Sequence, residues 1–240
     1  MENFTTRTIR DIAVESPATT RVFEEYKIDY CCHGNTTFND ACREAGVSPV
    51  EISKKLADVL RPDETPAADP TLELLIEHIL ETHHVYTKQE LEQLTPLMAK
   101  VVTRHGEHHP ELFELQTIFK EIRDDLAPHM IKEETVLFPY IIQLERNLAM
   151  HIAGPRPHFG TVVNPVRMMS IEHEAVGDLL LRMRDVSNEY QTPEGACPSF
   201  TALFARLADL ERDLHQHIHL ENNMLFPRAI ALEERVLMQL

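Results

Sequence analysis

The fold is decided by a stretch that occurs twice, as HMIKEETVLFP at residues 129–139 and as HIHLENNMLFP at residues 217–227. Both copies have the pattern His-x3-Glu-x3-Leu-Phe-Pro at a constant offset of 88 residues. Residues four apart lie on the same face of an α-helix, so each copy directs an imidazole and a carboxylate toward one point. A single such pair is usually a surface ion pair, but two copies in register are hard to produce from solvated faces. They predict a site for two metal ions.

Each copy is preceded by a lone histidine at a matching distance. His84 stands 45 residues before the first pair, and His173 stands 44 residues before the second. A histidine, a long gap and then His-x3-Glu is typical of two antiparallel helices, so two such units predict a four-helix bundle with inward ligands from every helix. The repeat selects six metal ligands: His84, His129, Glu133, His173, His217 and Glu221.

Neighbouring histidines are separated from these six by helical phase. Two residues turn an α-helix by about 200°, which places His215 and His219 on the side of the helix away from His217. At the first lone histidine the choice stays open, because His84 continues an apolar stripe at three-to-four spacing while His83 suits part of the same pattern. The other histidines are expected at the surface or in loops: His78, His105, His108, His109, His151 and His158.

The composition limits the class of protein. With 240 residues, 43% of them hydrophobic, the chain can bury one substantial core and a small second domain. Its formal charge of −16 argues against nucleic acid or an anionic membrane as partner, because the attraction to phosphate is reversed. The chain has no transmembrane-length apolar stretch and no secretory signal at its start, so we expect a soluble, cytoplasmic protein. Four cysteines are too few for a disulfide scaffold and are expected to be reduced thiols.

Helix caps can be read in the first quarter of the chain. Ser16 precedes a proline at a first helical position, and Thr37 and Ser48 each begin a capping-box pattern. Gly46 is expected to end the helix between the last two. These signals predict a small all-α N-terminal domain over residues 1–60.

Prolines mark the remaining boundaries. Three prolines within residues 61–70 predict a linker, and residues 71–240 are expected to form the bundle. Residues 154–160 separate the two ligand-bearing units, and residues 190–198 join the last two helices. The proline that closes each repeated stretch is expected to kink its helix or to end it.

The arrangement resembles the hemerythrin-like fold, whose four-helix bundle holds two irons through histidine and acidic residues. With DYCCHG at residues 29–34 and HGEHHPEL at residues 105–112 included, the chain is similar along nearly its whole length to the repair-of-iron-centres (RIC) di-iron proteins. One departure is His33, where many relatives have glycine. The resemblance carries over the same six ligands. It implies a stress-response protein that acts on damaged iron–sulfur proteins and restores clusters attacked by nitric oxide or peroxide.

The ligand chemistry is compatible with that role. Imidazole and carboxylate ligands without thiolates favour a di-iron or di-manganese centre over structural zinc. Glu133 and Glu221 are placed to bridge two metals about 3.5–4 Å apart. We expect two iron ions per chain, bridged by both carboxylates and by an oxo or hydroxo group, with manganese or zinc as substitutes. Oxygen or nitric oxide could occupy the open coordination positions.

Cys31 and Cys32 form the second chemical feature. Adjacent Cα atoms are about 3.8 Å apart, shorter than the usual disulfide span of about 4.4–6.8 Å, so free thiols are expected. The turn then presents thiolates for transient contact with iron or a cluster, or for redox exchange with a partner. The alternative is that they are two compact apolar residues at a turn. Cys42 and Cys197 are expected to serve packing only.

Three functions stay open at this point. The first is a di-iron protein that repairs iron–sulfur clusters by supplying or mobilising iron. The second is a hemerythrin-like protein that carries or senses oxygen or nitric oxide, against which the cysteine module counts. The third is a reductase of nitric oxide or peroxide. Asp125 and Glu172 are expected in solvated or outer positions around the metals. The oligomeric state is open, with a homodimer among the alternatives.

Overall fold

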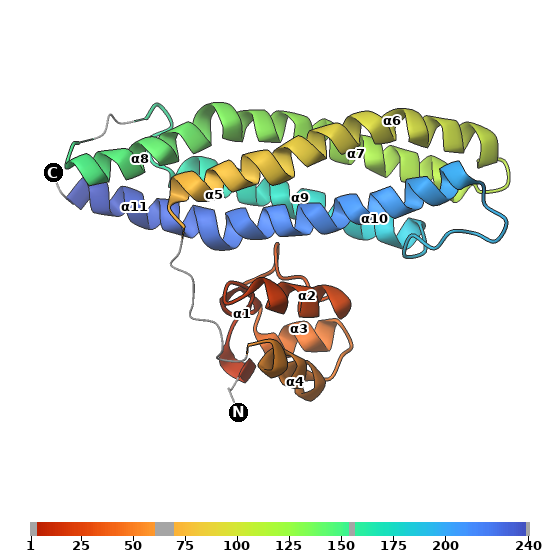
Figure 1. Cartoon of the computed structure of the whole chain (residues 1–240), viewed down its shortest axis with the longest axis horizontal. Helices are drawn as coiled ribbons and strands as arrows, with labels where there is room; N and C mark the ends of the chain where they lie inside the picture. The colour runs from red at the N-terminus through yellow and green to blue at the C-terminus, as the bar shows by residue number, and fades with distance from the viewer. Residues whose placement is uncertain (1–3, 61–69, 154–156, 239–240) are drawn as a thin grey trace.

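The computed structural model describes residues 4–60, 70–153 and 157–238, and these residues form helices without a β-strand. Long helices lie side by side as a rod, and a group of short helices lies beneath its middle (Figure 1). The fold class predicted from the sequence is thereby confirmed. The linker expected at residues 61–70 falls almost entirely outside the described residues. No described helix has an apolar stretch long enough to cross a bilayer.

The short helices follow a 3₁₀ turn, η1 (Phe4–Thr6), and comprise α1 (Ile9–Ala13), α2 (Pro17–Glu25), α3 (Phe38–Glu44) and α4 (Pro49–Val59). The side chains of Ser16 and Thr37 cap α2 and α3 as predicted. Gly46 follows α3 with a φ of +67°, a conformation that favours glycine. The capping box predicted at Ser48 does not form, because its side chain makes no cap hydrogen bond. Pro49 alone presets the first turn of α4.

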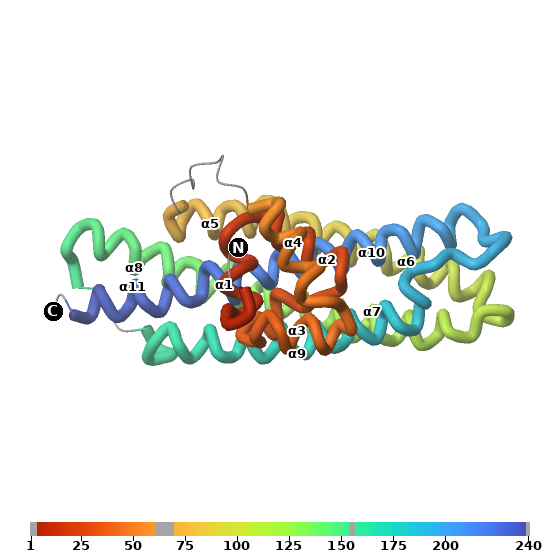
Figure 2. The backbone as a smooth tube through the Cα atoms, turned by 90° about the horizontal axis from the view of Figure 1, so that it is seen from below, coloured from red at the N-terminus to blue at the C-terminus, as the bar shows by residue number. Residues whose placement is uncertain are grey.

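The bundle contains four long helices, three of which are interrupted by a π turn. The first is α5 (Leu72–His78), η2 (Ile79–His84) and α6 (Val85–His105); the second is α7 (Glu111–Lys132), η3 (Glu133–Leu137) and α8 (Phe138–Met150); the third is α9 (Val163–Val186); the fourth is α10 (Pro198–His219), η4 (Leu220–Leu225) and α11 (Phe226–Met238). Seen from below, the short helices lie across α9 and the fourth long helix (Figure 2).

The two repeated prolines do not end their helices, contrary to one of the expected outcomes. The phenylalanine N–H of each Leu-Phe-Pro motif bonds to the carbonyl oxygen five residues earlier, Phe138 to Glu133 and Phe226 to Glu221. The proline that follows has no N–H to donate. The chain nevertheless continues as a helix beyond each π turn. Such turns are frequent at functional sites, and here both lie at the predicted metal ligands.

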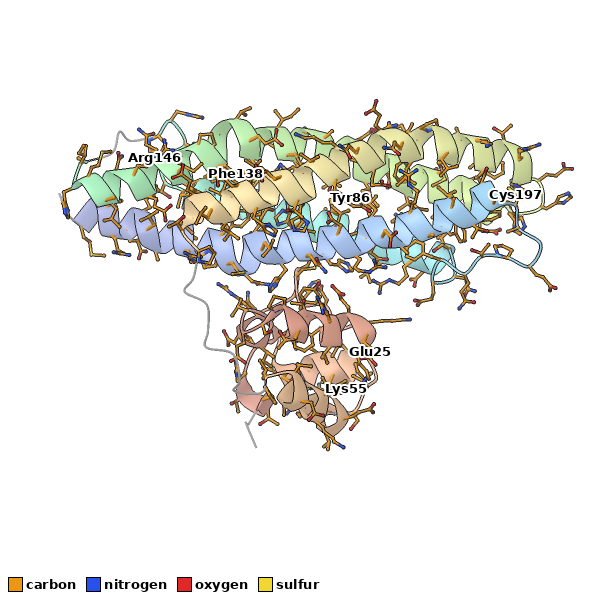
Figure 3. The ribbon with its side chains drawn as sticks, viewed as in Figure 1. Glu25, Lys55, Tyr86, Phe138, Arg146 and Cys197 are labelled. Atoms are coloured by element: carbon orange, nitrogen blue, oxygen red, sulfur yellow. The ribbon has the colours of Figure 1, made fainter. Side chains whose placement is uncertain are left out.

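Apolar cores fill the bundle on both sides of a polar layer. One core is made by α6, α7, α10 and the second half of α9, and the other by α5, α8, α11 and the start of α9. Phe138 lies inside the bundle, whereas Glu25 and Lys55 pair at the surface of the small domain (Figure 3). A third core belongs to the small domain and includes Ile218 of α10. The small domain is therefore packed directly against the helix that carries His217.

Candidate metal centre

The polar layer brings the six predicted ligands together as two groups. His84 and His217 form one group with Glu133 and Glu221. His129 and His173 form the other group with the same two glutamates. All ligand atoms of a group lie within 4.8 Å of one another. The facing Nε2 atoms are 3.1 Å apart in the first pair and 3.0 Å apart in the second. Every one of these side chains is buried, with residue exposures of 2% or less.

The two glutamates each reach both histidine pairs. Glu133 Oε1 lies 3.2 Å from His129 Nε2, and its Oε2 lies 3.5 Å from His84 Nε2. Glu221 places Oε2 3.1 Å from His173 Nε2 and Oε1 3.2 Å from His217 Nε2. One oxygen of each carboxylate thus faces each histidine pair.

The buried oxygens of these glutamates fit a metal site. Both oxygens of Glu133 and the Oε2 atom of Glu221 lack a hydrogen-bond partner, although both residues are fully buried. Burial of an unpaired carboxylate is costly. A cation in each group would satisfy these oxygens together with the facing Nε2 atoms, and imidazole with carboxylate suits iron, manganese or zinc.

Acidic residues hold one predicted ligand histidine in each of the two groups. His84 Nδ1 lies 2.7 Å from Glu134 Oε1, and His129 Nδ1 lies 2.7 Å from Glu172 Oε2. Lysine side chains pair with both carboxylates at the surface. With Nδ1 donating to a carboxylate, Nε2 keeps its lone pair for the metal. The outer position expected of Glu172 agrees with this contact, whereas Asp125 is exposed. The role of Glu134 was missed, although it directly follows Glu133 of the motif.

The other two ligand histidines differ from this pattern. His173 Nδ1 lies 2.9 Å from Oδ1 of Asn222, a neutral acceptor. His217 Nδ1 is buried without a partner. Aromatic rings of the repeated motif cover one ligand in each half: the ring centroids of Phe138 and His84 are 5.7 Å apart, and those of Phe226 and His173 are 5.9 Å apart. Both phenylalanines are buried and also belong to the apolar core beside the site.

Charge balance in the site shifts its pKa values. Burial alone would lower the pKa of His129, but the Glu133 carboxylate raises it to about 9. Burial opposes the same effect at His84, whose pKa is also raised by Glu133. Burial would raise the pKa of Glu221, yet His217 and His173 hold it well below its usual range. The raised pKa values of His84 and His129 therefore favour protonated imidazoles beside Glu133 in the metal-free protein.

His83, which the sequence left open, and the two histidines that helical phase set aside, His215 and His219, lie outside both groups. His83 is buried, with Nδ1 2.9 Å from Asp213 Oδ1. His215 lies 3.8 Å from Glu211. His219 is buried beneath the small domain, where it contacts Asn223 at 2.9 Å and the ring of Tyr30. The structure therefore places His84, and not His83, with the other ligands.

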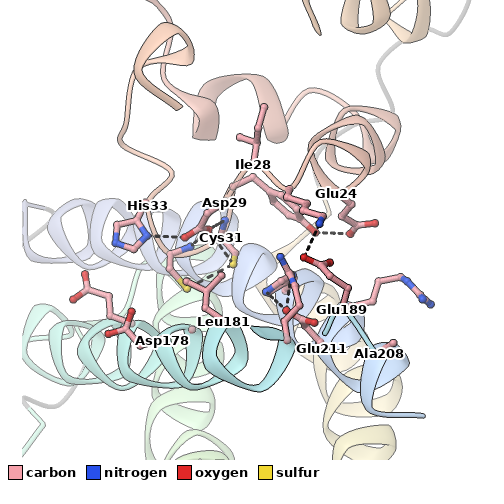
Figure 4. A pocket seen from close by; sticks show the side chains of 18 of the residues that line it. Glu24, Ile28, Asp29, Cys31, His33, Asp178, Leu181, Glu189, Ala208 and Glu211 are labelled. Atoms are coloured by element: carbon pink, nitrogen blue, oxygen red, sulfur yellow. Dashed lines mark hydrogen bonds and ion pairs between the residues drawn. The ribbon is translucent and has the colours of Figure 1, made fainter. Parts of the chain in front are cut away.

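The Cys31-Cys32 turn faces the bundle beside this centre (Figure 4). Asp29 Oδ1 accepts the N–H groups of Cys31 and Cys32, both at 2.9 Å, and its Oδ2 lies 2.6 Å from His33 Nδ1. The two Sγ atoms are 3.6 Å apart, so the thiols are free. Asp29, Cys31 and Cys32 place their ligand atoms within 4.8 Å of one another, a third group that could hold a metal ion. His33, the departure from the expected glycine, serves to hold Asp29.

Cys31 is a neutral thiol in this arrangement. The adjacent Cys32 thiol, burial and the nearby Asp29 carboxylate raise the pKa of Cys31 well above its ordinary value. Cys31 is only 4% exposed, whereas Cys32 is half-buried and places Sγ 3.6 Å from the carbonyl oxygen of His173. Cys42 is buried in the small domain, and Cys197 lies 3.1 Å from His105 Nε2 at the far end of the bundle. The Cys32 thiol, burial and Asp29 therefore disfavour a thiolate at Cys31 as long as no cation is bound.

Comparisons with known proteins agree with both parts of the chain. Residues 75–229 match the family described as Hemerythrin HHE cation binding domain, and residues 5–60 match the Domain of Unknown function DUF542. The chain belongs to the hemerythrin HHE family and, over nearly its whole length, to the iron–sulfur cluster repair proteins.

Three relatives show how far the similarity extends. The iron-sulfur cluster repair protein YtfE of Edwardsiella ictaluri is 32% identical, over 94% of this chain and 97% of the relative. The iron-sulfur cluster repair protein ScdA of Staphylococcus haemolyticus is 30% identical, over 91% of this chain and 95% of the relative. A probable iron-sulfur cluster repair protein of Haemophilus influenzae is 28% identical, over 95% of this chain and 98% of the relative. The similarity thus includes both the small domain and the bundle.

Proposed function

We propose that this chain is a di-iron protein of the cytoplasm that repairs iron–sulfur clusters damaged by nitrosative or oxidative stress, by supplying or mobilising iron. The observation that carries the proposal is the pair of buried glutamates, each of which directs one oxygen to each histidine pair. Two ions held in this way would be the source of the iron. Damaged iron–sulfur proteins are the partners, as the names of the relatives indicate for those proteins.

The residues divide the work between two domains, which we propose as residues 1–60 and 71–240. His84, His129, Glu133, His173, His217 and Glu221 hold the ions. Iron supplies Lewis acidity and redox chemistry when bound. Cys31 and Cys32 of the small domain make transient contact with iron or a cluster; their position against the ligand helix α9 supports this role.

A reconstitution assay tests the repair function. An iron–sulfur enzyme inactivated by nitric oxide is incubated with the iron-loaded protein, and recovery of its activity is followed. The matched variant is Cys31→Ala/Cys32→Ala, which leaves the six ligands in place; we expect it to keep two irons per chain and to lower the recovery. Undiminished recovery with this variant would reduce the cysteines to a packing role, and no recovery with the parent protein would refute the repair function.

One observation favours a second candidate, the binding or reduction of oxygen or nitric oxide. Each group offers two imidazoles and two carboxylate oxygens, which leaves open positions on an iron ion that prefers six ligands. Optical spectra of the iron-loaded protein, recorded with and without each gas, test this candidate. Reversible spectral change without cluster repair would favour gas binding, and consumption of nitric oxide with a reductant would favour a reductase.

A further inference from the structure

Asn222 connects the cysteine turn to a metal-ligand candidate. Its Nδ2 donates to the carbonyl oxygen of Cys31 at 3.1 Å, and its Oδ1 lies 2.9 Å from His173 Nδ1. A backbone carbonyl can only accept, so the amide nitrogen must face Cys31 and the amide oxygen must face His173. His173 Nδ1 must then carry the proton, which leaves the Nε2 lone pair for a metal. The position of the turn thus specifies the tautomer of this histidine.

The internal repeat shows that this position is distinctive. Glu134 stands 88 residues before Asn222 and lies against His84 Nδ1, as Asn222 lies against His173. An ionised carboxylate accepts hydrogen bonds and donates none, so glutamate at position 222 could hold His173 but could not bind the Cys31 carbonyl. The two halves of the bundle therefore differ at the residue on which the cysteine turn docks.

Further contacts leave the turn little room on the bundle. Asn223 Nδ2 donates to the carbonyl oxygen of Tyr30 at 2.8 Å. On the other side, a Cβ atom at Gly177 of α9 would lie 2.9 Å from the Sγ atom of Cys32. Real Cβ atoms essentially never show so close a contact, so a side chain at position 177 must displace the cysteine. This offers a way to displace the Cys32 thiol, on the side of the turn opposite Asn222, without touching a metal ligand.

We propose that Asn222 is a positioning residue that couples the placement of the Cys31-Cys32 turn to the ligand His173. The proposal rests on the proposed function only in taking His173 as a metal ligand. Coupling of this kind is reciprocal. A displaced turn alters the metal centre through His173, and occupancy of the metal centre alters the exposure of the cysteines.

The first experiment replaces Asn222 in the full-length, iron-loaded protein. Asn222→Asp keeps an acceptor for His173 but has no donor for Cys31, and the matched control Glu134→Gln changes the equivalent position of the other half. All of these proteins also carry Cys197→Ser, so that a thiol reagent reports on Cys31 and Cys32 of the turn. We expect Asn222→Asp to keep its iron and to raise the rate of thiol modification about five-fold, the change in population that one lost hydrogen bond typically produces.

The control should show a changed optical spectrum and an unchanged thiol rate. An unchanged thiol rate in Asn222→Asp would overturn the proposal, and so would an equal increase in Glu134→Gln. The same thiol measurement on metal-free protein tests the contact between Asn222 and the turn without any metal. Its outcome is therefore independent of whether the proposed repair function holds.

The second experiment moves the turn from the other side. Gly177→Ala should shift the optical spectrum of the iron-loaded parent, because Cys32 is displaced and the link through Asn222 transmits the movement. In an Asn222→Leu background, whose side chain can neither donate nor accept, Gly177→Ala should cause a smaller shift, because only the contact of Cys32 Sγ with the His173 carbonyl oxygen is left. Such non-additivity is the signature of coupling. Equal shifts in both backgrounds, or no shift in the parent, would overturn the proposal.

Discussion

Replacement of Glu133 by leucine separates a metal-binding role from a packing role. Glu133 is fully buried, and neither carboxylate oxygen has a hydrogen-bond partner. Only the imidazoles of His84 and His129 balance its charge in the metal-free protein. Replacement of a whole buried ion pair by apolar side chains is often neutral or stabilising by ~1–4 kcal/mol, and removal of one partner is costly when it leaves the other charged and uncompensated. At pH 8, where an unpaired imidazole is neutral, metal-free Glu133→Leu should therefore be at least as stable as the parent.

The same substitution should have the opposite effect in the presence of iron. Both ligand groups contain Glu133, so each ion loses one of its four protein ligands. We expect at most one iron per chain after desalting, as measured by elemental analysis. At a free iron concentration 100 times the dissociation constant, the parent gains about 2.7 kcal/mol of stability from one site. Anaerobic urea unfolding with and without iron should show that the variant loses most of this gain.

A nearby histidine provides the control for this experiment. His215 lies on the same helix as His217 but contacts Glu211 and belongs to neither ligand group. His215→Leu should keep two irons and the full stabilisation by iron. Retention of two irons by Glu133→Leu would refute the reasoning, and so would a loss of more than ~3 kcal/mol in its metal-free form, which is the size expected when a needed buried partner is removed.

Further expectations follow from the same site. Because the pKa of His129 is raised to about 9, its contribution to the stability of the metal-free protein is fully present below pH 6.5 and is lost as the pH rises through 9. Urea unfolding should show that the free energy of unfolding falls by up to ~3 kcal/mol over this range. Glu133→Leu should not show this fall. A fragment that starts near Asp69 should stay helical by circular dichroism and keep its metals; loss of iron would mean that the small domain helps to build the site. Glu172→Leu should weaken iron binding about 10–100-fold in a competition assay with a chelator, since it removes the partner of His129 Nδ1; unchanged affinity would contradict the role given to Glu172.

The bundle and the place of its ligands could be predicted because the chain repeats itself. A constant offset selects positions without any knowledge of how the helices pack, and the four-residue spacing in His129-x3-Glu133 sets a common face. The outer partners could not be predicted in this way. Whether Glu134 reaches His84 depends on the relative rotation of the first and second long helices, and a linear pattern does not contain that rotation.

The fate of His219 shows a second limit. Helical phase correctly places it away from His217, and a polar face away from a bundle core is normally solvated. Here the small domain covers that face, so that His219 is 6% exposed and contacts Tyr30. Burial lowers the pKa of His219 to about 4. The docking of one domain on another is set by the complementary surfaces of both, and the spacing of residues in either one does not reveal it.

Differences between the two ligand groups bear on how iron could be supplied. His129 and His173 both have a partner at Nδ1, which fixes the direction of each ring toward the metal. In the other group only His84 has such a partner, because His217 Nδ1 is buried without one. A metal held by one oriented and one unheld imidazole is bound less tightly than a metal held by two oriented ones. Under the proposed function, we therefore expect His84 and His217 to release an ion more readily than His129 and His173 would, and a chelator titration of the iron-loaded protein that removes both irons at one rate would contradict this order.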